Sequence, residues 1–170
     1  MGLLLLVFLL TVGLGFLLIF LIKKTSKRLS GEAAPPLPLP LQNLNFDEFY
    51  QMSCQLLEKL GLKINDSYRD SDLEADIYAE NPTPLIGGPV IVHLHLYPED
   101  GRITSVDVMN FAGNLVGERR GKGIYLTTGN FAPEVGTLPE LPPMDMIDGE
   151  ELYRLLQQHN LITPSANTPS

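Results

Sequence analysis

The sequence predicts an α/β domain with a mixed β-sheet flanked by helices, preceded by one transmembrane helix. Two observations predict it. Residues 2–22 carry no charged side chain and consist almost entirely of Leu, Val, Phe and Ile. From residue 43 onward, segments with apolar residues at helical spacing alternate with strand-like segments in the order αβββαβ(α)βα. A strand, helix, strand crossover normally joins parallel strands, so helices should cover both faces of the sheet.

The apolar segment 1–22 has the length of a membrane span, since about 20 helical residues cover roughly the 30 Å of a bilayer core. A cleaved signal peptide is the alternative. We favour the anchor because no basic residue precedes the run and no small-x-small cleavage site follows it at once. Lys23, Lys24, Lys27 and Arg28 come next, and the positive-inside rule therefore predicts a single-pass membrane protein with its domain on the cytoplasmic side.

Residues 23–42 are predicted to be a linker, basic at first and then proline-rich. Its prolines favour extended geometry that would hold the domain away from the membrane, and docking to an SH3-like partner is the alternative. The domain spans residues 43–161, and the polar segment 162–170 is expected to be a disordered tail. Cys54 is the only cysteine and falls among apolar residues, so we expect a core thiol in a reducing compartment.

The first half of the domain contains one helix and three strands. The helix begins after Asn45, and Glu48 stands three residues on, as in a capping box. A strand over 62–68 follows. Strands over 74–79 and 90–96 then form a hairpin, because a turn rich in Pro and Gly separates them.

The second half begins with a helix capped by Thr104 or Ser105. Its expected apolar stripe consists of Val106, Met109, Phe111, Ala112, Leu115 and Val116. Short strands over 124–126 and 144–147 follow, and Asp148 caps the last helix.

The hairpin places candidate metal ligands on one face of the sheet. His93 and His95 are two residues apart in a strand, so both side chains point to the same face. Asp76 can face them from the neighbouring strand. A carboxylate with two imidazoles can hold a divalent metal. The His-x-His spacing alone is a weak signal, and two histidines on a half-solvated strand face remain the alternative.

A second group of residues is a candidate for contacts with nucleic acid. Arg119, Arg120 and Lys122 precede the loop 127–130, where backbone amides near Thr128 could meet an anion. The alternative is that these basic residues interact with the dipole of the preceding helix. From residue 41 onward the chain has 8 basic and 19 acidic residues, a net charge of −11, so the domain as a whole repels DNA.

Several segments resemble a known family: DIYAE and VIVHLHLY in the hairpin, then GKGIYLTTGNFAPEV and MIDGEELYRLL. Over about residues 46–156 the chain resembles the Mrr-type restriction endonuclease domain of the PD-(D/E)xK nuclease superfamily. The segments TTGNFAPE and IDGEEL are the most specific. The resemblance implies a restriction-endonuclease-like fold, DNA as a partner, and phosphodiester hydrolysis with Mg²⁺ or Mn²⁺.

The resemblance also implies catalytic roles. Asp76 matches the family's aspartate, and His93 and His95 occupy the places of its Gln/Glu-x-Lys, which hold the metal and activate the attacking water. Glu48 on the first helix would assist. A histidine in place of the lysine carries a positive charge only in part at neutral pH. Asp76, His93 and His95 could instead bind a transition metal and retain hydrolysis by a changed mechanism.

Three functions are therefore open. The first is a membrane-anchored protein of this fold that has lost the usual chemistry and serves in binding or assembly. The second is an active metal-dependent DNA endonuclease, similar to type IV restriction enzymes. The third is an anchored metal-binding or sensor domain without nucleic acid. We favour the first, because the lysine is missing and the domain is acidic.

Overall fold

The computed structural model describes residues 39–97, 102–118 and 121–162. The predicted transmembrane segment, most of the predicted linker and nearly all of the predicted tail lie outside these residues. Within the described ranges, no helix is both long and apolar enough to cross a membrane.

A five-stranded mixed sheet forms the centre of the domain, as the sequence predicts. Its strand order is β1-β2-β3-β5-β7. The first three strands are antiparallel, and the last two run parallel to β3. The strands are β1 (Lys63–Arg69), β2 (Glu74–Asn81), β3 (Gly88–His95), β5 (Lys122–Thr127) and β7 (Met144–Ile147).

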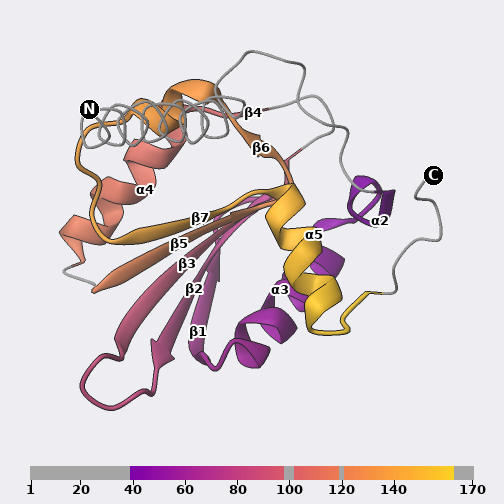
Figure 1. Cartoon of the computed structure of the whole chain (residues 1–170), viewed down its shortest axis with the longest axis horizontal. Coiled ribbons are helices and arrows are strands. Elements are labelled where there is room, and N and C mark those ends of the chain that lie inside the picture. The colour runs from indigo at the N-terminus through magenta and orange to yellow at the C-terminus, as the bar shows by residue number, and fades with distance from the viewer. Residues whose placement is uncertain (1–38, 98–101, 119–120, 163–170) are drawn as a thin grey trace, which may run out of the picture. The chain divides into compact units, whose positions relative to one another are not determined.

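Helices cover both faces of this sheet, with α3 and α5 on one side and α4 on the other (Figure 1). The helices are α2 (Leu39–Gln42), α3 (Phe46–Lys59), α4 (Ser105–Gly117) and α5 (Gly149–Gln158). The three predicted N-caps are confirmed, because the side chains of Asn45, Thr104 and Asp148 each accept a hydrogen bond from a backbone N–H three residues on.

The core on the α3 and α5 side is apolar. Val92 and Leu94 of β3 pack here with Leu56 of α3 and Leu152 of α5, and all four are buried. Leu41, at the end of the predicted linker, is only 2% exposed and belongs to the same core. Cys54 is half-buried against this core, where burial raises the pKa of its thiol.

The core on the α4 side includes Ile91 of β3 and Tyr125 of β5, packed against Phe111 and Leu115 of α4. The apolar stripe that we predicted for this helix is only half correct. Phe111, Ala112 and Leu115 are buried together with Val108, whereas Val106, Met109 and Val116 are exposed. The helix has more apolar residues than one face can bury, and the spacing of residues 108, 111, 112 and 115 is the one that faces the sheet.

Three small elements are absent from the predicted order or differ from it. The strands β4 (Arg102–Ile103) and β6 (Asn130–Phe131) pair in parallel as a second, two-stranded sheet. The segment Pro133–Thr137, which stands where the predicted order has its bracketed helix, is a short 3₁₀ helix. Strands of two residues show no alternation in a sequence, which is why β4 and β6 escape prediction.

Candidate metal centre

The pairing register of three strands sets the positions of the site residues. On β2 and β3, Glu74 lies opposite His95 and Asp76 lies opposite His93. On the other side of β3, His93 is next to Tyr125 of β5. Since side chains alternate along a strand, these five side chains share one face of the sheet, the face that α4 covers.

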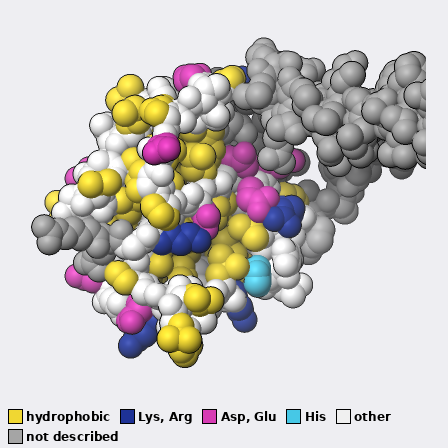
Figure 2. Space-filling model, turned by 60° about the vertical axis from the view of Figure 1, so that its left-hand side comes forward, with side chains coloured by type: hydrophobic (Ala, Val, Ile, Leu, Met, Phe, Trp, Pro, Cys, Tyr) yellow, Lys and Arg dark blue, Asp and Glu magenta, His cyan; other side chains and the backbone are white. Residues whose placement is uncertain are grey.

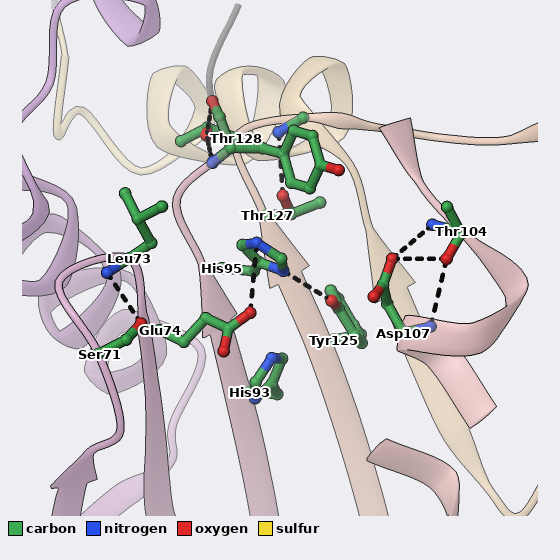
Figure 3. A network of polar contacts seen from close by, with 12 residues as sticks. Ser71, Leu73, Glu74, His93, His95, Thr104, Asp107, Tyr125, Thr127 and Thr128 are labelled. Atoms are coloured by element: carbon green, nitrogen blue, oxygen red, sulfur yellow. Dashed lines mark hydrogen bonds and ion pairs between the residues drawn. The ribbon is translucent and has the colours of Figure 1, made fainter. Parts of the chain in front are cut away.

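Polar contacts connect the five side chains in two groups. Asp76 Oδ1 lies 2.7 Å from His93 Nδ1. His95 Nδ1 lies 2.9 Å from the Tyr125 hydroxyl, and its Nε2 lies 3.4 Å from Glu74 Oε1. Figure 3 shows His95 between Glu74 and Tyr125, with His93 beside them on the same strand. Each imidazole therefore has its Nδ1 engaged by a partner on an adjacent strand.

Aromatic rings enclose the two imidazoles. His93 stacks on Phe111 of α4 with 5.4 Å between ring centroids, and its ring is 4.8 Å from that of Tyr125. On the other side, the ring of His95 is 4.8 Å from that of Tyr97. These contacts hold both imidazoles in place and keep most of their surface from water.

Burial and charge determine the protonation of the site. The His95 side chain is 10% exposed, and burial lowers its pKa, while the nearby Glu74 carboxylate opposes that shift. Burial also raises the pKa of Tyr125 far above its usual range. At neutral pH His95 is thus a neutral imidazole and Tyr125 a neutral phenol, next to the carboxylates of Glu74 and Asp76.

The structure brings together Asp76, His93 and His95, as the alternation of the two strands predicts. It adds Glu74, which we did not predict. One ligand atom from each of Glu74, His93 and His95 lies within 4.8 Å of the others. Glu74 is two residues before Asp76 and so shares its face, and this spacing was the signal in the sequence that could have indicated it.

Glu48 does not join the site. It lies in the first turn of α3, on the opposite side of the sheet from the two histidines. Its carboxylate accepts a hydrogen bond of 3.0 Å from the backbone N–H of Asn45. The capping box that we predicted therefore accounts for Glu48, and the assisting catalytic role does not fit its position.

Of the predicted nucleic-acid contacts, the structure describes only Lys122 and Thr128, and it does not bring these two together. Arg119 and Arg120 lie outside the described residues. Lys122 pairs with Asp145 at 2.7 Å at the start of β5, whereas Thr128 follows the end of that strand, about 20 Å away at 3.3 Å per residue. Thr128 is fully buried, and its backbone N–H, the group predicted to meet an anion, donates to the His95 carbonyl at 3.3 Å. Its hydroxyl is hydrogen-bonded to the backbone N–H and C=O of Tyr97. Neither donor of Thr128 is therefore free for a phosphate.

Comparison with protein families gives a match over residues 41–156, to the Mrr catalytic domain, described as a restriction endonuclease. The chain belongs to this family. The Mrr catalytic domain thus extends from the buried Leu41 to the buried Leu156 of α5 and contains all five strands of the main sheet. A comparison with curated proteins finds no match.

Two solved structures show limited similarity to this Mrr catalytic domain. One is the DNA modification-dependent restriction endonuclease AspBHI, with a TM-score of 0.47 and 13% identity over 68% of this chain and 32% of that one. The other is the MspJI restriction endonuclease in complex with a 27-mer oligonucleotide, with a TM-score of 0.43 and 15% identity over 63% of this chain and 26% of that one. The chain thus spans about a third or less of either enzyme.

Proposed function

We propose that this chain is a membrane-anchored DNA-binding protein of the restriction endonuclease family that no longer carries out the family's usual cleavage. The proposal rests on two observations: the chain belongs to this family, and a buried histidine, His95, stands at the position of the family's lysine. The apolar segment 2–22 and the basic residues that follow it support an anchor with the domain on the cytoplasmic side. Binding or assembly on DNA near the membrane would then be its role.

The observation that carries the loss of cleavage is the environment of His95. This residue stands where the resemblance places a lysine, beside the scissile phosphate. It is 8% exposed, its Nδ1 is engaged by Tyr125, and burial lowers its pKa. A neutral imidazole supplies no positive charge to a phosphate, so the usual chemistry lacks one of its components.

Charge limits how DNA can bind. Phosphate contacts normally come from several Lys and Arg residues, and Lys122 is already paired with Asp145. On the face that Figure 2 presents, the basic side chains of the described residues occur in separate places among acidic ones rather than as a continuous surface. We therefore expect weak binding that salt abolishes easily.

A second candidate function is supported by the polar cluster on the sheet. Glu74, His93 and His95 form a group of metal-ligating atoms, so an endonuclease that depends on a metal other than Mg²⁺ is the alternative. In that case Asp76, His93 and His95 would be needed for cleavage, as the sequence predicts.

A plasmid assay separates the two functions. The full chain in detergent is incubated with supercoiled plasmid, methylated or unmethylated, in the presence of Mg²⁺, Mn²⁺ or Zn²⁺, and Asp76→Ala serves as the control. We expect no nicking, together with a salt-sensitive rise in the anisotropy of a labelled duplex. Nicking by the native chain that Asp76→Ala abolishes would refute the loss of cleavage and establish the second function.

The anchor is tested independently. We expect the full chain to stay with the membrane fraction after alkaline carbonate extraction, and a chain that begins at Ala34 to be released. A protease added to sealed inside-out vesicles, which expose the cytoplasmic face of the membrane, should digest the domain. Release of the full chain by carbonate would contradict the anchor without affecting the DNA-binding assay.

A further inference from the structure

We propose that Glu74, His93 and His95 form a binding site for a transition-metal ion of the zinc class, with Asp76 and Tyr125 as positioning residues. The ligand set differs from the one that we predicted, because Glu74 takes the place of Asp76. The site requires neither DNA binding nor cleavage, so it stands or falls separately from the proposed function.

The first argument is the spacing of the ligand atoms. Two ligands at about 2.1 Å from a tetrahedral ion lie about 3.4 Å apart. His95 Nε2 and Glu74 Oε1 are 3.4 Å apart, and one atom of each of the three side chains lies within 4.8 Å of the others. An ion can therefore enter between them with little movement of the backbone.

The second argument is which nitrogen each histidine offers. Asp76 is a hydrogen-bond acceptor, so the 2.7 Å contact places the proton of a neutral His93 on Nδ1 and leaves the lone pair on Nε2. The Tyr125 hydroxyl can either donate or accept a hydrogen bond. It can therefore accept one from Nδ1–H of His95, which leaves the lone pair of the His95 ring on Nε2. A histidine that binds a metal through one ring nitrogen typically donates a hydrogen bond from the other to a carboxylate or another polar group, and this bond orients the imidazole.

The third argument is the kind of ion that these atoms select. Mg²⁺ and Ca²⁺ take oxygen ligands, whereas imidazoles suit zinc and its neighbours among the transition metals. The donor set of two nitrogens and one carboxylate oxygen thus fits the oxygen-preferring ions of the family poorly.

The fourth argument is the charge around the site. The carboxylate of Glu74 lies 3.4 Å from His95 and that of Asp76 lies 2.7 Å from His93. A divalent cation would offset this concentration of negative charge. Three protein ligands leave a further coordination position for water or another small ligand, and Glu74 is 32% exposed at the side chain, so the position can be reached from solvent.

The test is the metal content of the full chain in detergent. The protein is stripped with a chelator and mixed with Zn²⁺ at a concentration equal to that of the protein, in the presence of a large excess of Mg²⁺. It is then passed through a gel-filtration column, and its metal content is measured by mass spectrometry. We expect about one zinc per chain. Replacement of zinc by Co²⁺ should give the visible absorption bands of a tetrahedral or five-coordinate site with nitrogen and oxygen ligands.

Three variants assign the ligands. Glu74→Gln, His93→Gln and His95→Gln should each weaken Zn²⁺ binding at least about 100-fold in calorimetry. His159→Gln is the matched control, because the third histidine caps the C-terminal end of α5 on the other side of the sheet. Glu74 is only half-buried, so its variant should keep the fold, and circular dichroism checks this.

Two results would overturn the site: no zinc retained by the native chain, or zinc affinity in Glu74→Gln and His93→Gln equal to that of His159→Gln. Either result leaves the DNA-binding assay unaffected. Conversely, a chain that binds zinc but not DNA would keep the site and refute the proposed function.

Discussion

Asp76 and His93 are opposite residues of β2 and β3, and the register of the two strands places the carboxylate 2.7 Å from His93 Nδ1. Because the partner is a carboxylate on a rigid neighbouring strand, the His93 ring is fixed in both orientation and tautomer. Asp76 thereby acts on the proposed metal through His93 rather than as a ligand.

The first prediction concerns this hydrogen bond. Asp76→Asn keeps the shape of the side chain but removes its charge, so we expect Zn²⁺ affinity to fall about 10- to 100-fold, less than in the ligand variants. Calorimetry of the folded variant checks this. Asp145→Asn, which changes an exposed carboxylate of β7, should leave the affinity unchanged. An effect of Asp76→Asn as large as that of His93→Gln would make Asp76 a direct ligand.

The second prediction concerns cleavage. The double variant His93→Gln/His95→Lys restores the Gln-x-Lys pattern that the resemblance implies, and Glu74 can pair with the new ammonium group. We expect it to nick plasmid in the presence of Mg²⁺, where the native chain does not. Adding Asp76→Ala should abolish this activity. A folded double variant without activity would mean that the loss of cleavage involves more than the lysine.

The third prediction concerns pH in the absence of metal. Burial lowers the pKa of His95 in the folded protein, so below about pH 6.5 the unfolded chain takes up a proton that the folded chain does not. The contribution of His95 to stability is therefore present above the unfolded pKa and is lost as the pH falls, by at most about 1.4 kcal/mol per pH unit. Urea unfolding between pH 8 and 5 should show a smaller decrease for His95→Gln than for the native chain.

The fourth prediction concerns the contact of β5 with α4. A Cβ on Gly123 would overlap the side chain of Leu115 and press on Phe111, both of which are buried. Gly123→Ala should cost about 1–3 kcal/mol in the free energy of unfolding. The matched control is Gly113→Ala in α4, where an added Cβ meets nothing within 4 Å. For Gly113→Ala, the free energy of unfolding should rise by about 0.5–1 kcal/mol, because alanine favours a helix more than glycine does. Equal effects of the two substitutions would contradict the close packing.

The sequence predicts helix starts and strand positions well because both depend on neighbouring residues. The caps Asn45 and Asp148 satisfy amides three residues away, and the strand Met144–Ile147 has the bounds that we predicted. The stripe of α4 is predicted less well, since which of several apolar faces is buried depends on the sheet beneath it.

The site is predicted in part for the same reason. Alternation places His93 and His95 on one face, and it allows Asp76 to meet them. It does not fix the register between β2 and β3, and the register alone decides that Glu74 faces His95. The support from Tyr125 depends on a parallel pairing 30 residues away, which no local pattern indicates.

The proposed ligands all belong to a single hairpin, β2 and β3, and this has a consequence for the order of folding. Asp76 and His93 are 17 residues apart, and the strands close over a short turn, so little chain entropy opposes their meeting. Tyr125 reaches His95 only after the crossover through α4 has formed, a slower event in a parallel pairing. If the proposed ion binds, the hairpin can hold it before the rest of the sheet is complete, and the ion would then favour the correct register among those that the hairpin samples.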